Sequence, residues 1–292
     1  MMSFRSNCPL AARRAWSLMV AAALLTTPAW SADDRGTAAA GAPAASTEGT
    51  ARTESQREAA ALLDGMAKHL AGLQSFSVYF RAGYDVVQPN GQKIEFGETR
   101  RVQLGRPDRL RVEEVASDGT RDLAVFDGRS ITVLDADAGV YAQAPQPATL
   151  DDALGYFLRE LRMRMPLALL LATRLPAVLA ERVKSIDYVE RTEILGVTTH
   201  HVAGRGENVD FQFWITDGAR PLPLRVVITY RDSPGLPQFW ASFLDWNTQP
   251  QFAKDTFQFT PPPGAKPVAF AVQVLSPAAT QERPGMNGDL QP

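Results

Sequence analysis

Cysteine and histidine are nearly absent from this chain of 292 residues, which holds one cysteine, Cys8, and three histidines. Disulfide scaffolds and zinc sites are built from several such residues, so the part of the chain after Cys8 has no disulfide framework. His200 and His201 are adjacent in an expected strand, where consecutive side chains point to opposite faces. They therefore cannot hold one metal ion together, and we expect no metal site and no cofactor.

The chain also lacks a strong charge of either sign. It has 30 lysines and arginines against 32 aspartates and glutamates, a formal net charge of −2. This balance argues against a nucleic-acid partner. No G-x-S-x-G motif is present, and the carboxylate pair Asp151-Asp152 stands where a helix should begin, a position that the helix dipole favours. We therefore expect a protein that is not an enzyme.

One apolar run, residues 15–25, stands near the N-terminus. Arg5, Arg13 and Arg14 precede it, and Ala29-Trp30-Ser31 follows as a small-x-small cleavage site. This order predicts a cleavable signal peptide over residues 1–31 and a periplasmic location. An N-terminal membrane anchor is the alternative, but the run is shorter than the roughly 20 residues of a spanning helix. We expect no transmembrane segment in the mature chain.

Composition predicts three further segments. Residues 32–52 are rich in alanine, glycine and threonine without periodicity, which is typical of a flexible linker. Residues 274–292 are similar and predict a disordered tail. Residues 53–273 then form one domain, within the length that mainly β domains reach.

The domain should begin with a helix and continue as strands. Thr53 and Gln56 form a capping-box pattern, and apolar residues recur at helical spacing from Ala59 to Leu70. About five short strands follow, with turns such as Asn90-Gly91 between them, and about five more come after Ser185. Strands that pair with their neighbours in sequence build an antiparallel sheet, and about ten such strands curl or close.

A leucine-rich segment from Thr149 to residue 182 separates the two sets of strands. Pro166 and Pro176 should break it into two or three short helices. A membrane span is the alternative, but Arg159, Arg162 and other charges within it would be costly in a bilayer. We expect these helices to plug the opening of the curved sheet.

Three motifs, in this order and spacing, resemble a known superfamily. They are Arg106-Pro107-x-x-Leu110, the run Phe126-Asp127-Gly128-Arg129-Ser130-Ile131-Thr132-Val133, and Phe257-Gln258-Phe259-Thr260-Pro261-Pro262. The superfamily is that of the periplasmic lipoprotein carriers typified by LolA and LolB. Within it, Trp214-Ile215-Thr216-Asp217 followed by Pro221-Leu222-Pro223-Leu224-Arg225 is similar to an uncharacterised family of predicted periplasmic proteins, a domain of unknown function.

The resemblance implies a LolA-like fold: an incomplete, half-open β-barrel with helices as its lid and an apolar cavity for acyl chains. It also implies a role for Arg106 as a lid latch, because the corresponding arginine in the carriers hydrogen-bonds the lid backbone. The sequence departs from the carriers just before this arginine, where Gln103-Leu104-Gly105 replaces their aromatic residue. The fold therefore carries over better than the cargo does.

Apolar side chains of the sheet and of the mid-chain helices are the predicted ligand-binding set. Methionine and aromatic residues suit an adaptable pocket. The set is Phe76, Val78, Phe80, Phe157, Leu158, Leu161, Met165, Phe211, Phe213, Phe239 and Phe243.

These expectations favour a periplasmic binding or carrier protein for a lipid, a lipid-linked molecule or another hydrophobic ligand, acting without catalysis. The alternative is an envelope scaffold or sensor that uses the same fold to bind a protein partner. The two differ in whether the interior is open or filled, and the sequence leaves that question open.

Overall fold

The computed structural model describes residues 52–146, 148–159 and 167–270, without the side chains of residues 158 and 159. The helices are α1 (Glu54–Gly72), α2 (Leu150–Arg159), the 3-10 helix η2 (Ala168–Leu171) and α3 (Leu175–Arg182). The strands before α2 are β1 (Ser75–Val87), β2 (Lys93–Gly105), β3 (Arg109–Ala116), β4 (Arg121–Phe126), β5 (Ser130–Asp135) and β6 (Val140–Pro145). Those after α3 are β7 (Ser185–Ile194), β8 (Val197–Arg205), β9 (Val209–Thr216), β10 (Pro223–Tyr230), β11 (Gln238–Asn247) and β12 (Lys266–Val268).

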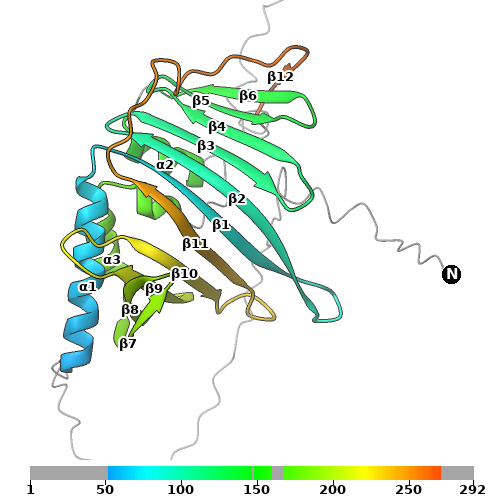
Figure 1. Cartoon of the computed structure of the whole chain (residues 1–292). Helices are drawn as coiled ribbons and strands as arrows, with labels where there is room; N and C mark the ends of the chain where they lie inside the picture. The colour runs from blue at the N-terminus through cyan, green and yellow to red at the C-terminus, as the bar shows by residue number, and fades with distance from the viewer. Residues whose placement is uncertain (1–51, 147, 160–166, 271–292) are drawn as a thin grey trace, which may run out of the picture. The chain divides into compact units, whose positions relative to one another are not determined.

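All the strands belong to one curved sheet (Figure 1). Its order is β12-β6-β5-β4-β3-β2-β1-β11-β10-β9-β8-β7, and the two end strands do not pair with each other in the described part of the chain. Every neighbouring pair is antiparallel except β12 with β6. The predicted class, a mainly β protein with a large, unclosed antiparallel sheet and helices on it, is confirmed.

Strand pairing differs from the expectation at the centre of the sheet. β1 pairs with β2 on one side and with β11 on the other, from Ser77 opposite Asn247 to Tyr84 opposite Phe239. This long-range pair joins two sets of strands, and a second one places β12 beside β6 at the edge of the sheet. The prediction of purely local pairing was therefore wrong at these two places.

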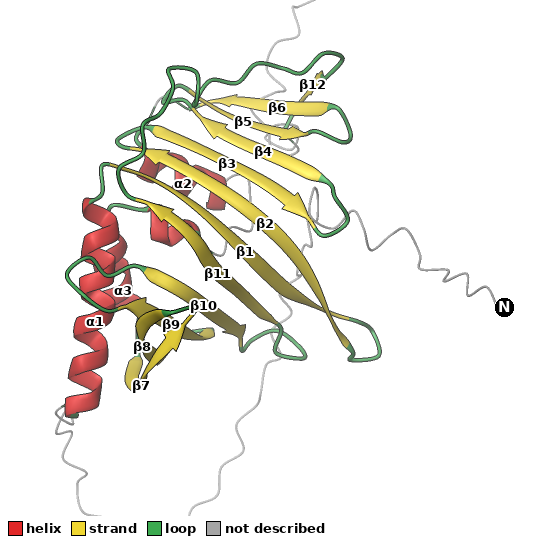
Figure 2. Cartoon of the chain, in the orientation of Figure 1, coloured by secondary structure: helices red, strands yellow, loops and turns green. Residues whose placement is uncertain are grey.

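Side chains of β1 define the two faces of the sheet. Phe76, Val78 and Phe80 are buried, and the face that carries them is called the inner face here. Their neighbours Ser77 and Tyr79 lie on the outer face, as the period of two requires. Figure 2 shows the helices gathered on one side of the sheet.

Helix α1 begins with the predicted capping box. Thr53 accepts a hydrogen bond from the Gln56 backbone, and the Gln56 side chain accepts one from the Thr53 N–H. The helix packs against β7, β8, β9 and α3. Ser55 bonds both backbone groups of Tyr188 on the edge strand β7, at 3.1 Å to the N–H and 3.4 Å to the carbonyl.

The mid-chain segment forms short helices, as its prolines predict. α2 ends at Arg159, and the predicted break at Pro166 lies outside the described residues. Pro176 stands in the first turn of α3, where its missing N–H costs nothing. Within the described ranges, every helix is too short or too polar to cross a membrane.

Residues 251–265 form a strap without regular secondary structure that leads from β11 to β12. Phe259 contacts Tyr141 of β6, with ring centroids 5.2 Å apart, and Phe257 lies against Gly105 at the end of β2. Gln103, Arg111 and Leu123, on the outer face, line a hollow together with strap residues. The strap therefore covers part of the outer face, opposite the helices.

Candidate functional site

The inner face carries an aromatic floor where β1 meets β11. Phe80 and Phe243 lie opposite each other with ring centroids 5.3 Å apart, and Phe76 contacts Trp246 at 5.5 Å. Phe243 and Trp246 stack at 5.4 Å, so the four rings form one continuous surface. Val78, Val102 and Val112 extend it across β1, β2 and β3.

The 3-10 helix η2 lies over this floor and leaves a small cavity. Leu167, Ala168, Leu170 and Leu171 face the floor from above. The cavity between them holds about 30 Å³. Sites for small molecules are typically about 300 to 1,000 Å³, so no acyl chain fits while the leucines hold this position.

The structure brings four of the predicted ligand-binding residues together around the cavity: Phe76, Val78, Phe80 and Phe243. Four others are buried in the same core but do not line the cavity: Phe157, Phe211, Phe213 and Phe239. The Leu158 side chain, Leu161 and Met165 lie outside the described residues. A role of this set in binding stays a prediction.

Sequence reasoning missed Trp246 and Arg100 as lining residues. A β-bulge explains the first, because the register shifts between Tyr79 and Phe80 and turns Phe243 and Trp246, three residues apart, to the same face. A signal existed for the second. Counting back by twos from Leu104 and Val102 places Arg100 and Glu98 on the inner face of β2.

Arg100 is the centre of a buried ion-pair network beside the cavity. Its Nη2 lies 2.8 Å from Glu98 Oε1 and 2.9 Å from Glu114 Oε2. The side chains of Arg100, Glu98 and Glu114 are 7%, 2% and 16% exposed. Burial raises the pKa of Glu114 to about 7, the nearby Glu98 adds to this, and Arg100 opposes it. The inner face therefore changes from apolar to charged within one strand.

Arg106 stands where the sheet meets the end of α1. Its Nε donates to the Leu73 carbonyl at 2.9 Å, and its backbone N–H donates to Gln74 at 2.8 Å. Both Nη atoms are buried and bond no other residue in the described ranges. Burial lowers the pKa of Arg106, and the neighbouring Asp151 opposes this shift.

Arg106, the predicted latch, thus bonds the C-terminal end of α1, and the neighbouring Pro107 bonds the first residue of α2. The Pro107 carbonyl accepts a hydrogen bond from the Leu150 N–H at 2.7 Å. Asp151 in turn accepts from the Thr173 N–H at 2.9 Å and from its hydroxyl at 2.5 Å. The turn at 106–107 therefore contacts both the end of α1 and the start of α2. A latch role for Arg106 stays a prediction.

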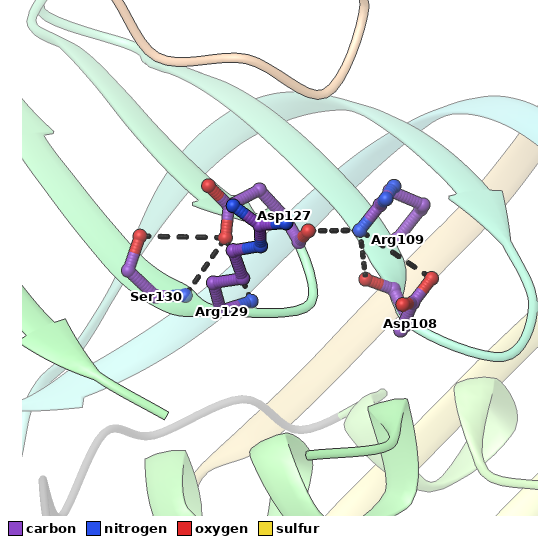
Figure 3. A network of polar contacts seen from close by, with 5 residues as sticks. All are labelled: Asp108, Arg109, Asp127, Arg129 and Ser130. Atoms are coloured by element: carbon purple, nitrogen blue, oxygen red, sulfur yellow. Dashed lines mark hydrogen bonds and ion pairs between the residues drawn. The ribbon is translucent and has the colours of Figure 1, made fainter. Parts of the chain in front are cut away.

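The Asp127-Gly128-Arg129-Ser130 motif forms a turn beside Asp108 and Arg109 (Figure 3). Asp127 Oδ1 accepts from the Arg129 N–H at 2.9 Å and the Ser130 N–H at 2.7 Å, and the Asp127 carbonyl accepts from Arg109. Gly128 has a φ of +83°, and a Cβ there would meet Arg109 and Asp108 at 2.5 Å. The motif thus has a structural reason, which is to join the β2–β3 and β4–β5 turns.

A second hollow, of about 430 Å³, lies on the outer face beneath the strap. Polar side chains dominate its lining: Gln103, Arg111, Asp255, Thr256, Gln258 and Thr260. Arg111 is already held by Glu113 at 2.8 Å and by the Thr256 carbonyl at 3.5 Å. A hydrophobic ligand would gain little here, so the inner face is the better candidate site.

The histidines lie apart, as the sequence predicts. His201 stacks on Trp214 with centroids 4.0 Å apart, whereas His200 contacts the Tyr188 hydroxyl at 3.2 Å and Asp217 at 3.3 Å. In the described part of the chain, no group of three or more His, Cys, Asp or Glu residues is arranged to hold a metal ion.

The family model described as "Predicted periplasmic protein (DUF2092)" matches residues 59–271. The chain belongs to this family. The membership that the motifs predicted is thus confirmed, and the matched span includes every residue around the cavity. The sequence matches no curated protein.

Solved structures similar to this DUF2092 protein include the following three. LprF from Mycobacterium bovis is 16% identical, with 72% of this chain and 98% of that chain covered and a TM-score of 0.43. A chain of the Pseudomonas aeruginosa MucA/MucB complex is 17% identical, with 70% and 61% covered and a TM-score of 0.39. A LolA superfamily protein from Nitrosomonas europaea is 12% identical, with 69% and 97% covered and a TM-score of 0.30.

Proposed function

We propose that this DUF2092 protein is a non-catalytic periplasmic carrier that binds a lipid or another hydrophobic ligand on its inner face. The observation that carries the proposal is the covered aromatic floor. Phe76, Phe80, Phe243 and Trp246 form one continuous apolar surface, and a separate short helix, rather than the sheet itself, covers it. Displacing η2 would expose this floor without breaking a strand.

Burial of apolar surface would supply the affinity. Each methylene group moved from water onto the floor contributes about 0.8 kcal/mol, so a chain of ten or more carbons offsets the cost of moving a short helix. Met and aromatic side chains elsewhere in the core can adjust to the ligand. The present volume of about 30 Å³ represents the closed, empty form under this proposal.

The test measures binding directly. Lipid extracted from the purified full chain is identified by mass spectrometry, and uptake of a fluorescent fatty acid is titrated. Leu170→Ala, which removes part of the cover, is expected to increase uptake severalfold. Leu179→Ala in α3 is the matched control, because it makes the same truncation away from the cavity. A preparation without bound lipid, together with no uptake of the fatty acid by the wild type or by Leu170→Ala, would reject the carrier function.

The latch has its own test. Arg106→Leu removes the hydrogen bond to Leu73 and is expected to slow ligand release, because α1 and the neighbouring helices can then stay open. Arg109→Leu, in the same turn but bonded to Asp127, serves as the control. Unchanged release from Arg106→Leu would remove the latch role while leaving the carrier function intact.

A second candidate is favoured by the small cavity. If about 30 Å³ is the working state, the interior is filled and the protein acts as an envelope scaffold or sensor for a protein partner. An empty preparation that captures a defined envelope protein, with Leu170→Ala having no effect on capture, would support this alternative over the carrier.

A further inference from the structure

A row of charged side chains crosses the inner face of the sheet beside the cavity, which is unusual for a buried face. Arg100 of β2 lies opposite Glu114 of β3, Glu114 lies opposite Asp122 of β4, and Asp122 lies opposite Asp135 of β5. Glu98 adds a further carboxylate on β2, two residues from Arg100. One guanidinium therefore faces four carboxylates along a face that is apolar nearer the helices.

Burial makes this arrangement unfavourable when every carboxylate is charged. Glu98 and Glu114 share the same Nη2 atom of Arg100, so a single positive charge lies between two buried negative ones. A buried charge without its own partner is costly, and it avoids that cost by binding a proton. Glu114 is the group placed to do so, since it also faces Asp122.

The other charged groups around Glu114 act in the same direction, apart from Arg100. Asp122 has a pKa raised to about 6 by partial burial, by Glu114 and by Asp135 and Asp137. Asp122 keeps more contact with water than Glu114, whose side chain is 16% exposed, so water screens the charge of Asp122 better and Glu114 dominates the row. Tyr84 of β1 has a pKa raised by burial and by Glu98, Glu114 and Asp118, and it stays neutral.

We propose that the Glu98–Arg100–Glu114 network is a proton-linked lock on the inner face of the sheet. Protonation of Glu114 stabilises the folded sheet at this place, and deprotonation destabilises it. Arg100 is a lining residue of the cavity, so the lock adjoins the surface proposed for the ligand. The effect on stability is independent of any ligand. Its extension to ligand binding, with tighter holding at acidic pH, rests on the proposed carrier function.

The sign of the effect follows from the pKa of Glu114 in the two states. In the unfolded chain the pKa is near 4.5, and in the folded protein it is about 7. Between these values the folded state holds a proton that the unfolded state lacks, so stability decreases as pH rises from about 4.5 to about 7. His69, whose pKa burial and Arg220 lower, acts oppositely below its ordinary value of 6.5. Asp122, with a pKa raised from 3.8 to about 6, acts in the same direction as Glu114 at lower pH. Only a comparison of variants separates these three contributions.

The experiment measures urea unfolding of the full chain at pH 5, 6, 7 and 8. From pH 5 to pH 8 the contribution of Glu114 should raise the unfolding constant of the wild type by up to about 100-fold. Glu114→Gln, which mimics the protonated side chain, should remove this contribution and be the more stable form at pH 8. Glu113→Gln is the matched control, because Glu113 lies next in the strand but faces outward to Arg111. It should follow the wild type.

Parallel pH profiles for the wild type and Glu114→Gln would overturn the proposal. If Glu114→Gln does not fold, infrared spectra of the wild type decide, since a protonated carboxyl band at pH 6 that disappears by pH 8 is required. Binding of a fluorescent diacylglycerol, which has no titratable group, is measured at pH 6 and pH 8 in parallel. Absence of binding at both would count against the carrier function, while the unfolding profiles would still decide the lock.

Discussion

The two faces of the sheet each place an arginine among bulky neighbours, and they stabilise it in opposite ways. On the inner face, Arg100 is buried and paired with two glutamates. On the outer face, Arg225 is half-buried between two indoles, 5.7 Å from the centroid of Trp214 and 5.4 Å from that of Trp240, and donates to Ser242 at 3.0 Å. Water reaches the second arginine but barely reaches the first.

The difference shows that the energetic cost of burying charge falls on the inner face. A half-buried cation over aromatic rings makes a modest favourable contact that holds neighbouring strands together. A buried ion pair, by contrast, seldom adds stability over apolar residues of similar size. Its presence beside an apolar cavity therefore suggests a purpose other than stability, and it directs attention to the inner face.

The largest expected effect comes from removing the inner arginine. Arg100→Met leaves Glu98 and Glu114 buried without a cation, and breaking such a pair typically costs about 3 to 5 kcal/mol of unfolding free energy. Urea unfolding at pH 8 measures this loss. At pH 5 the loss should be smaller, because a protonated Glu114 no longer needs the cation. An equal loss at both pH values would contradict this view of the inner face.

An intermediate effect is expected from adding one methyl group at two buried valines. Val226→Ile inserts it into close packing between Phe213 and Ala241 and should cost about 1 to 3 kcal/mol. Val112→Ile inserts it beside the cavity and should change stability by less than about 1 kcal/mol. Thermal unfolding of the two variants compares them directly. Similar losses at both positions would mean that the cavity is not available space.

The smallest effect is expected on the outer face. Arg225→Met removes two cation–π contacts and one hydrogen bond at a half-exposed position and should cost about 1 kcal/mol. The loss should change less between pH 5 and pH 8 than that of Arg100→Met, since no buried carboxylate is left without its cation. Urea unfolding under the conditions used for Arg100→Met provides the measurement. A loss as large as that of the inner arginine would remove the distinction between the faces.

Local patterns predicted the elements of this fold well. The capping box at Thr53, the start of a new helix at Pro176 and the alternation of Phe76, Val78 and Phe80 all correspond to the structure. Each depends on a few neighbouring residues whose preferences are visible in the sequence. The fold class and the family followed from such patterns together with the order of three motifs.

Long-range relations were not predictable in the same way. Nothing near β1 indicates that residues 238–247 will pair with it, and the bulge that turns Trp246 inward depends on that pairing. The cavity and the ion-pair network also arise only when β2, β3, β11 and η2 meet. The predicted binding set includes Phe76, Phe80 and Phe243 of the aromatic floor but lacks Trp246 and Arg100, and its role in binding stays a prediction.

The pairing of β1 with β11 has a consequence for the order of assembly. β1 is the first strand to be synthesised and β11 the last long one, yet they are adjacent at the middle of the sheet. A growing polypeptide that has not yet supplied residues 238–247 leaves both β1 and β10 with an unpaired backbone edge, so the sheet stays in two pieces. Contacts this remote in sequence form slowly. The two pieces of the sheet can therefore join only after nearly all of the polypeptide has been made.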